Sequence, residues 1–389
     1  MKICFLYESA FTLGGVQRCI TMLSNYLVHK GYEVTIICTN TRVPINREIY
    51  GLDKEVQVLF TKKQNIIRKC INRGLKLIKQ LNYKTGCLKN NTKILDFIYY
   101  YYFGRYVQEI IDEKNYDILI GCGEYHSKLA SMMKKKEMKK IGWQHHTYDM
   151  YFNADHNFWN EEACSNEMFK NLDGYVVLTL DDKKKLKKLK NVNCETIYNP
   201  IGFKQEFKSK LESKKFLALG RLDKVKGFDR LINNFSQFHK KNKEWILEIY
   251  GDGPEREKLE KQVKLLGLEN VVNIYHRAQN VKEIYREASV YCMSSYTEGW
   301  GLVILEAMES GLPVISYEMP CIKEIFKTRY EGIVIPMDDD EKYVSEMLTL
   351  ANDKSLREKV ANNAYKRAKD FDMEKIGEQW ENLFKNLKN

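Results

Sequence analysis

The sequence predicts an α/β protein with two parallel-sheet domains, and three observations lead to this prediction. Short apolar runs typical of buried strands alternate with segments whose apolar residues recur at helical spacing. Glycine turns follow several of these strands and open the next helix. The chain also has 389 residues, more than one hydrophobic core usually holds. We expect domains over residues 1–198 and 199–370, with a final segment, 371–389, that crosses back onto the first domain.

The amino-terminal half begins with a strand, a turn, a helix and a second strand. Residues 2–7 are apolar, Gly14 and Gly15 form the turn, a helical stripe ends at Gly31, and residues 33–39 are apolar again. Such a unit implies a parallel sheet with a right-handed crossover. The glycine loop lacks G-x-G-x-x-G spacing, so no dinucleotide fingerprint is present. Further strands are expected at residues 56–60, 117–121, 141–144 and 175–179.

A basic glycine turn in the second half has the features of a phosphate site. A strand at 216–219 ends at Gly220, Arg221 and Lys226 follow, and a helical pattern begins after Gly227. A helix N-terminus offers unpaired N–H groups and a positive dipole end, and the two cations add the charge that a diphosphate leaving group needs. A solvated basic loop is the alternative. Another strand, 245–250, runs into a second glycine turn, GDGP.

Two carboxylates flank a loop-to-helix junction further along. Glu298 stands in the loop, and Glu306 lies about two turns into a helix that Gly311 ends before a strand at 313–316. Each carboxylate can accept two hydroxyl hydrogen bonds, as the vicinal diols of a hexose or ribose supply. The alternative is that the two glutamates have this spacing by chance and are solvated surface charges. Between them, Gly299 and Gly301 allow φ/ψ values closed to other residues and let a ligand approach the backbone.

Taken together, these segments resemble the retaining glycosyltransferases of family 4. Three segments match that family's donor domain in order and spacing: GRLDKVKGFDRLI, IYGDGPEREKLE and YTEGWGLVILEAMESGLPVIS. The segment GGVQR at 14–18 resembles its amino-terminal glycine loop. The resemblance covers nearly the whole chain and implies the GT-B fold, two Rossmann-like domains facing across a cleft. It implies transfer of a hexose or N-acetylhexosamine from a nucleoside-diphosphate sugar, UDP-linked sugars being favoured.

The resemblance also implies roles for individual residues. Arg221 and Lys226 would bind the donor diphosphate, Glu306 the ribose hydroxyls and Glu298 the transferred sugar. The backbone of Gly15 would meet the diphosphate from the other domain. The remaining expected donor contacts are Gly14, Gly299, Trp300, Gly301 and Leu302.

Two histidines directly follow the strand at 141–144. In the family a histidine at this place faces the donor sugar, and the pattern W-x-H favours His145 over His146. Its expected role is to position a sugar hydroxyl and the charge developing near the anomeric carbon. A metal role is disfavoured, because adjacent histidines project differently and no third ligand is spaced nearby. Two loop histidines with surface or structural hydrogen bonds are the alternative.

The chain places no evident base to deprotonate an attacking hydroxyl. The resemblance therefore implies a front-face mechanism in which the departing diphosphate oxygen takes the proton, with Arg221, Lys226, Glu298 and His145 as the catalytic residues. Residues 338–340, DDD, contain the D-x-D form of a metal motif, but they precede a helical run and are expected to cap it. We expect neither a metal nor another cofactor.

Charge is a second signal. The chain carries 63 Lys and Arg against 52 Asp and Glu, and residues 62–93 hold ten basic residues and no acidic one. Apolar residues recur at helical spacing there, which predicts a basic amphipathic helix suited to an anionic membrane surface. From this basic face we infer a lipid-linked or other saccharide acceptor. A solvated face packed on the core is the alternative, for this segment and for KKKLKKLK at 183–190.

No apolar run is long enough to span a bilayer, the first strand begins at Lys2, and ten cysteines show no C-x-x-C spacing. We expect a cytoplasmic protein, peripheral on the inner face of the cell membrane and active in surface glycan synthesis. No nucleic-acid module is visible, so nucleic acid is not expected as a partner. Two rivals remain, a GT-B sugar-nucleotide epimerase and a non-catalytic basic protein that binds lipid or nucleic acid.

Overall fold

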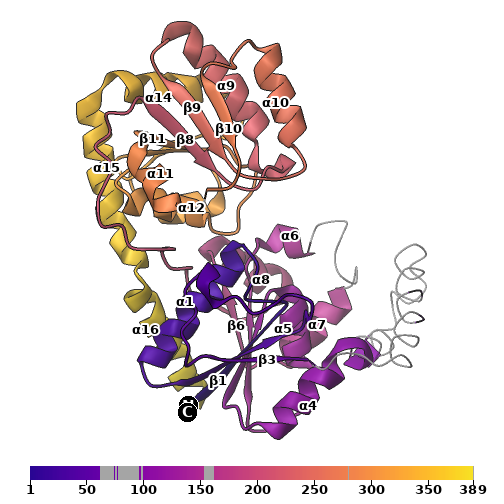
Figure 1. Ribbon diagram of the computed structural model, residues 1–389. Helices are drawn as coiled ribbons and strands as arrows, with labels where there is room; N and C mark the ends of the chain where they lie inside the picture. The colour runs from indigo at the N-terminus through magenta and orange to yellow at the C-terminus, as the bar shows by residue number, and fades with distance from the viewer. Residues whose placement is uncertain are drawn as a thin grey trace. The chain divides into compact units, whose positions relative to one another are not determined.

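The computed structural model describes residues 1–61, 100–152, 162–278 and 280–388, together with residues 74, 77, 96 and 97 (Figure 1). The chain divides into two units: Met1–Tyr198 with Met373–Asn389, and Asn199–Asp372. Each unit contains one sheet, and the strand pairs in both sheets are parallel. The predicted α/β class with two parallel-sheet domains is confirmed.

The first unit is built on a seven-stranded sheet with the order β3-β2-β1-β4-β5-β6-β7. Strand β1 lies inside the sheet, and its Ile3 is in register with Val34 on one side and Ile118 on the other. The predicted strands lie within two residues of those observed, whereas β7 was not predicted. The elements are β1 (Lys2–Tyr7), α1 (Gly15–His29), β2 (Glu33–Cys38), η1 (Arg47–Ile49), β3 (Gln57–Phe60), η2 (Tyr100–Gly104), α4 (Arg105–Glu113), β4 (Ile118–Cys122), α5 (Glu124–Ser131), β5 (Lys139–Trp143), α6 (Tyr148–Phe152), α7 (Glu162–Lys170), β6 (Gly174–Val177), α8 (Leu180–Lys190), β7 (Glu195–Thr196) and α16 (Met373–Lys388).

Helix α16, at the end of the chain, belongs to the first unit and packs against α1 (Figure 1). Its Trp380 is buried with its ring centroid 4.8 Å from that of Trp143. The hydroxyls of Tyr26 and Tyr32 donate hydrogen bonds to Glu381 at 3.0 and 2.8 Å. An apolar ring and a shared carboxylate therefore attach the helix to this unit.

The second unit is built on a six-stranded sheet with the order β10-β9-β8-β11-β12-β13. Three of its short strands, β10, β11 and β13, were not predicted from the sequence. The elements are β8 (Lys215–Leu219), η3 (Lys224–Lys226), α9 (Phe228–Lys241), β9 (Ile246–Tyr250), α10 (Arg256–Leu265), β10 (Val272–Tyr275), α11 (Val281–Glu287), β11 (Val290–Met293), α12 (Leu302–Glu309), β12 (Val314–Tyr317), α13 (Pro320–Ile325), β13 (Ile333–Ile335), α14 (Asp340–Asn352), α15 (Lys354–Ala368) and η4 (Lys369–Phe371).

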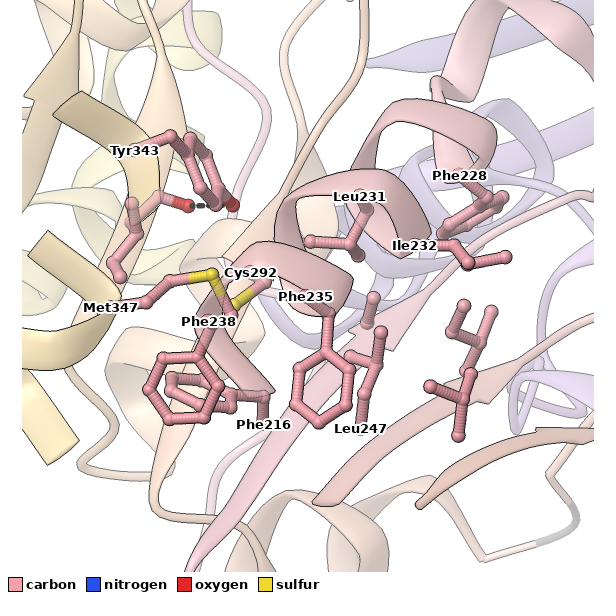
Figure 2. Close-up of a cluster of buried hydrophobic side chains, with 14 of the residues drawn as sticks. Phe216, Phe228, Leu231, Ile232, Phe235, Phe238, Leu247, Cys292, Tyr343 and Met347 are labelled. Atoms are coloured by element: carbon pink, nitrogen blue, oxygen red, sulfur yellow. Dashed lines mark hydrogen bonds between the residues drawn. The ribbon is translucent and has the colours of Figure 1, made fainter. Parts of the chain in front are cut away.

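Helix α9 is held on this sheet by large apolar side chains. Phe228, Leu231, Phe235 and Phe238 point into the cluster that covers the strands (Figure 2). The ring centroid of Phe238 lies 5.0 Å from that of Phe216 on β8, edge to face. The start of α9 is therefore a rigid support for the loop that precedes it.

Apart from Gly74 and Leu77, the basic segment 62–93 lies outside the described residues. The second basic stretch forms most of α8, where Leu186 is buried and two lysines are paired: Lys183 with Glu195 and Lys185 with Asp149. This stretch is therefore at least partly a solvated face packed on the core. In the described ranges, no helix is both long and apolar enough to cross a membrane.

Candidate active site

Two loops of the second unit meet at one edge of its sheet. One follows β8 and reaches from Gly220 to Gly227, and the other follows β11 and reaches from Ser294 to Gly301. Strands β8 and β11 are hydrogen-bonded neighbours and parallel, so both loops leave from carboxyl ends. Ligands of open α/β sheets bind at this edge. The sequence predictions for Lys226 and Glu298 thus fall on adjoining loops.

The side chains of Lys226 and Glu298 form an ion pair. The Lys226 Nζ lies 2.6 Å from Glu298 Oε1, and the hydroxyl of Ser295 donates to the same oxygen at 2.8 Å. Both side chains are largely shielded from water, with 27% of Lys226 and 11% of Glu298 exposed. A cation and a carboxylate are therefore held together at the sheet edge.

The two loops approach each other so closely that one position requires glycine. Gly227 has φ +61°, and a Cβ placed there would lie 2.2 Å from the carbonyl oxygen of Ser294. The Ser294 hydroxyl donates to the Lys226 carbonyl at 3.0 Å, and the Tyr296 N–H donates to the Val225 carbonyl at 2.8 Å. The backbone around the ion pair is therefore fixed from both sides.

Arg221 lies apart from this pair. Its side chain is 70% exposed, and its Nε is 3.7 Å from Asp223 Oδ2. At this distance and exposure the contact with Asp223 holds the guanidinium weakly. The guanidinium N–H groups of Arg221 can therefore bind an anion.

Glu306 lies on α12 with 2% of its surface exposed. The hydroxyl of Tyr285, on α11, donates to Glu306 Oε2 at 3.1 Å. A buried carboxylate is costly unless hydrogen bonds stabilise it, so this contact is part of what keeps it in place.

The junction between Glu298 and Glu306 differs in detail from the prediction. Gly301 caps α12 with φ +80°, but Gly299 does not adopt positive φ, so the special freedom expected at both glycines applies to Gly301 alone. Trp300 is 2% exposed, with its ring centroid 5.6 Å from that of Phe371. Any donor contact from Trp300 therefore comes from its backbone. Leu302 begins the helix, where the first N–H groups lack intrahelical partners.

In the first unit, Gly14 and Gly15 form the start of α1. Gly14 has an extended φ of 175°, and its N–H donates to the Tyr50 hydroxyl at 2.7 Å. A Cβ at Gly14 would lie 2.4 Å from Gln17 Oε1. Glycine at 14 therefore makes room for a neighbouring side chain.

His145 follows β5 at the carboxyl edge of the first sheet and is 6% exposed. Burial, with a smaller contribution from His146, lowers the pKa of His145 to about 3. Within the described part of the chain, neither ring nitrogen has a hydrogen-bond partner. The ring is therefore neutral at physiological pH and can still donate and accept. His146 is exposed, with its ring edge-on to Tyr151.

Two family models match the chain, one after the other. The model "Glycosyltransferase Family 4" matches residues 13–203, and the model "Glycosyl transferases group 1" matches residues 202–367. Together they include the glycine loop, His145 and both carboxylates. This chain belongs to the family 4 glycosyltransferases.

Full-length relatives of this glycosyltransferase have similar lengths. An uncharacterized glycosyltransferase of Haemophilus influenzae is 28% identical, with 98% of this chain and 99% of the relative covered. A Campylobacter jejuni protein is 26% identical over 100% of this chain and 99% of its own, and is named GalNAc-alpha-(1->4)-GalNAc-alpha-(1->3)-diNAcBac-PP-undecaprenol alpha-1,4-N-acetyl-D-galactosaminyltransferase.

The GT-B fold is confirmed by solved structures. A mutant of S. aureus TarM, crystallised with Fondaparinux, alpha-GlcNAc-glycerol and UDP, has a TM-score of 0.77 at 15% identity, over 98% of this chain and 99% of that one. At this identity the likeness establishes the fold alone.

In this family 4 glycosyltransferase, the acidic triplet 338–340 is accounted for by local structure. The Asp339 side chain accepts from the Lys342 N–H and caps α14, as predicted. Asp340 accepts from the Tyr317 hydroxyl, and Asp338 lies 3.6 Å from Arg230. In the described ranges, no three His, Cys, Asp or Glu side chains are grouped to hold a metal ion.

Sequence reasoning missed two groups of residues, one in each unit, that lie near predicted site residues of their own unit. Ser294, Ser295 and Arg230 surround the Lys226–Glu298 pair, and Glu124 follows β4 beside His145. Burial raises the pKa of Glu124 to about 7, and the N–H groups of Glu124 and His145 both donate to the Tyr151 hydroxyl at 3.3 Å. The pattern G-C-G-E after a strand was a usable signal for Glu124. The serines had none, because β11 itself was not predicted.

Proposed function

We propose that this glycosyltransferase moves a hexose or N-acetylhexosamine from a nucleoside-diphosphate sugar, with UDP favoured, to a lipid-linked saccharide in surface glycan synthesis. The observation that carries the proposal is the Lys226–Glu298 pair at a glycine-lined sheet edge. It joins a cation suited to a diphosphate with a carboxylate suited to sugar hydroxyls. UDP is favoured because it is bound in the TarM structure.

In the proposed reaction, Arg221 and Lys226 bind the diphosphate, and Glu298 binds the sugar. The bond between the anomeric carbon and the diphosphate oxygen breaks while the acceptor hydroxyl oxygen bonds to the same face of that carbon. The proton of the hydroxyl passes to the departing diphosphate oxygen. Because the new bond forms on the face that the diphosphate leaves, the anomeric configuration is retained. Positive charge at the leaving group stabilises the developing diphosphate. This step needs no metal.

The other predicted contacts complete the proposed donor site. Glu306 binds the ribose hydroxyls, and the backbones of Gly14, Gly15 and residues 299–302 contact the donor. His145, neutral because its pKa is lowered, offers one N–H and one acceptor nitrogen to sugar hydroxyls. Its unpartnered ring nitrogens support this role.

A lipid-linked acceptor is supported by the Campylobacter jejuni relative, whose name includes PP-undecaprenol. The ten basic residues of 62–93 support a cytoplasmic enzyme held peripherally on an anionic membrane surface. A sugar-nucleotide epimerase would use the same donor residues without an acceptor. Transfer is favoured because the relatives are named as transferases.

Thermal unfolding with a panel of nucleotide sugars tests the donor. A donor at a hundred times its dissociation constant should add about 2.7 kcal/mol to the unfolding free energy. Incubation of that donor with a polyprenyl-diphosphate-linked saccharide should then give an elongated lipid with an α- or β-linkage matching that of the donor. Conversion of the donor to its epimer without acceptor would instead establish the epimerase, and stabilisation by no nucleotide sugar would contradict both enzymes.

A further inference from the structure

We propose that Arg230 is a positioning residue for Glu298, acting through Ser294 and Ser295. The inference rests on the proposed function, in which Glu298 binds the transferred sugar. Arg230 lies outside the expected diphosphate contacts and does not touch Glu298 itself. Its effect would therefore fall on use of the sugar rather than on binding of the nucleotide.

Arg230 extends from the first turn of α9, between two residues of the apolar core. Its neighbours Phe228 and Leu231 point into the cluster shown in Figure 2. Arg230 is only 6% exposed, so its guanidinium must find its hydrogen-bond acceptors inside the protein. A charged group held this way on a packed helix has one well-defined position.

The guanidinium binds two consecutive carbonyls of the loop after β11. Its Nε donates to the Ser294 oxygen at 2.8 Å and its Nη2 to the Ser295 oxygen at 3.0 Å. Its Cζ lies 4.2 Å from the ring centroid of Tyr296 and 3.6 Å from that of Tyr317. The planar fork of an arginine suits such paired acceptors, and a lysine does not reproduce it.

Ser295 transmits this constraint to the carboxylate. Its carbonyl accepts from Arg230 while its hydroxyl donates to Glu298 Oε1 at 2.8 Å. A movement of the Ser295 backbone would move the hydroxyl and leave Glu298 Oε1 with its bond to Lys226 alone. Groups that act on a reacting substrate need placement within about half an ångström, so this link is close enough to affect turnover.

Charge pairing does not account for Arg230. Its nearest carboxylate is that of Asp338, at 3.6 Å and 82% exposed. Exposed partners at this distance contribute little. The two carbonyl bonds and the two rings are the stronger contacts, and three of these four belong to the loop that carries Glu298.

A second buried arginine provides a matched control. Arg357 on α15 is 7% exposed, donates to the carbonyls of Leu350 and Ala351, and lies over the ring of Trp245. Trp245 precedes β9 at its amino end, whereas the Glu298 loop leaves the carboxyl end of β11. The two arginines have similar chemistry, and only Arg230 contacts the Glu298 loop.

A double-mutant cycle between Arg230 and Glu298 tests the inference. Arg230→Gln should lower kcat by about tenfold or more while the Kd for free nucleoside diphosphate changes by less than about threefold. In the Glu298→Gln background the same change should cost less than about twofold, since the carboxylate it positions is gone. Arg230→Lys should restore part of the loss. Arg357→Gln should lower Tm and leave kcat unchanged in both backgrounds.

An equal loss of kcat from Arg230→Gln in both backgrounds would overturn the inference and leave the proposed function intact. A parent-like kcat for Glu298→Gln alone would overturn the sugar-binding role of Glu298 and the inference with it. If Arg230→Gln does not fold, Ser295→Ala replaces it, because this change keeps the carbonyl and removes the hydroxyl. It should lower kcat about fivefold in the parent and not in Glu298→Gln. An equal loss in both would again overturn the inference.

Discussion

The ammonium group of Lys226 and the carboxylate of Glu298 are paired with each other, 2.6 Å apart. The cation proposed for the diphosphate and the carboxylate proposed for the sugar therefore share one hydrogen bond. A bound diphosphate would have to share Lys226 with Glu298 or draw it away. Removal of either partner leaves a largely shielded charge without its counterion, which costs stability as well as activity.

The two proposed diphosphate cations should accordingly differ in one respect. Arg221→Ala and Lys226→Ala should each lower turnover by about a hundredfold or more, by analogy with the loss of an oxyanion donor. Only Lys226→Ala should also lower Tm, since Arg221 is 70% exposed and exposed side chains contribute little to stability. Steady-state kinetics and thermal melts of both variants check this. Near-parent turnover in either folded variant would remove it from the leaving-group site.

Calorimetric titration should distinguish the roles of the two carboxylates, Glu298 and Glu306. If Glu306 binds ribose, Glu306→Gln should weaken binding of both the free nucleoside diphosphate and the donor. Glu298→Gln should not weaken binding of the nucleoside diphosphate, because it removes the carboxylate that competes for Lys226, and it should impair use of the donor. Equal weakening of nucleoside diphosphate binding in both variants would contradict the assigned roles.

The sequence predicted the glycine turns and both carboxylates because those features are local. A glycine turn after an apolar run can be recognised within ten residues. The contacts of Arg230 with Ser294 and Ser295 join residues 64 and 65 positions apart, and no local pattern encodes them. The same holds for Trp300, because its position in a predicted loop does not indicate that its ring packs against Phe371.

Strand length explains two of the elements that were missed. Strand β13 has three residues and β7 has two, too short for a periodic pattern to stand out. Strand β11, which carries the Glu298 loop, has four residues, and strands of that length such as β12 were predicted, so length does not explain its omission. The sequence prediction therefore names motifs at the sheet edge and omits the residues that hold them.

The buried histidines of the first unit predict how stability depends on pH. Burial lowers the pKa of His126 to about 3, below its unfolded value of 6.5. The unfolded chain therefore takes up the proton first as pH falls, and the folded state loses stability below about pH 6.5. Between pH 7 and pH 5 this one site should cost about 2 kcal/mol.

Urea unfolding of the parent and of His126→Gln at both pH values measures that contribution. The variant is expected to be less stable at pH 7, because the ring contacts Tyr7 and bonds Thr39. Its stability should nevertheless fall less between pH 7 and pH 5. An identical pH dependence in the two proteins would mean that folding does not lower the pKa of His126.

The proposed membrane association can be tested by removing positive charges from segment 62–93. Ten cations without a carboxylate should bind anionic lipid at about 1 kcal/mol for each cation near the surface, and salt should weaken this. Changing Arg68, Lys69, Arg73 and Lys76 to Gln should release the enzyme from anionic vesicles at physiological salt without altering donor affinity.

The same charge change on exposed lysines of the second unit is the control: Lys241, Lys243, Lys261 and Lys264. If both quadruple variants sediment as the parent does, the segment does not hold the enzyme on the membrane, and a soluble saccharide becomes the better acceptor. If both are released equally, net charge is responsible, and no one surface can be assigned to the membrane.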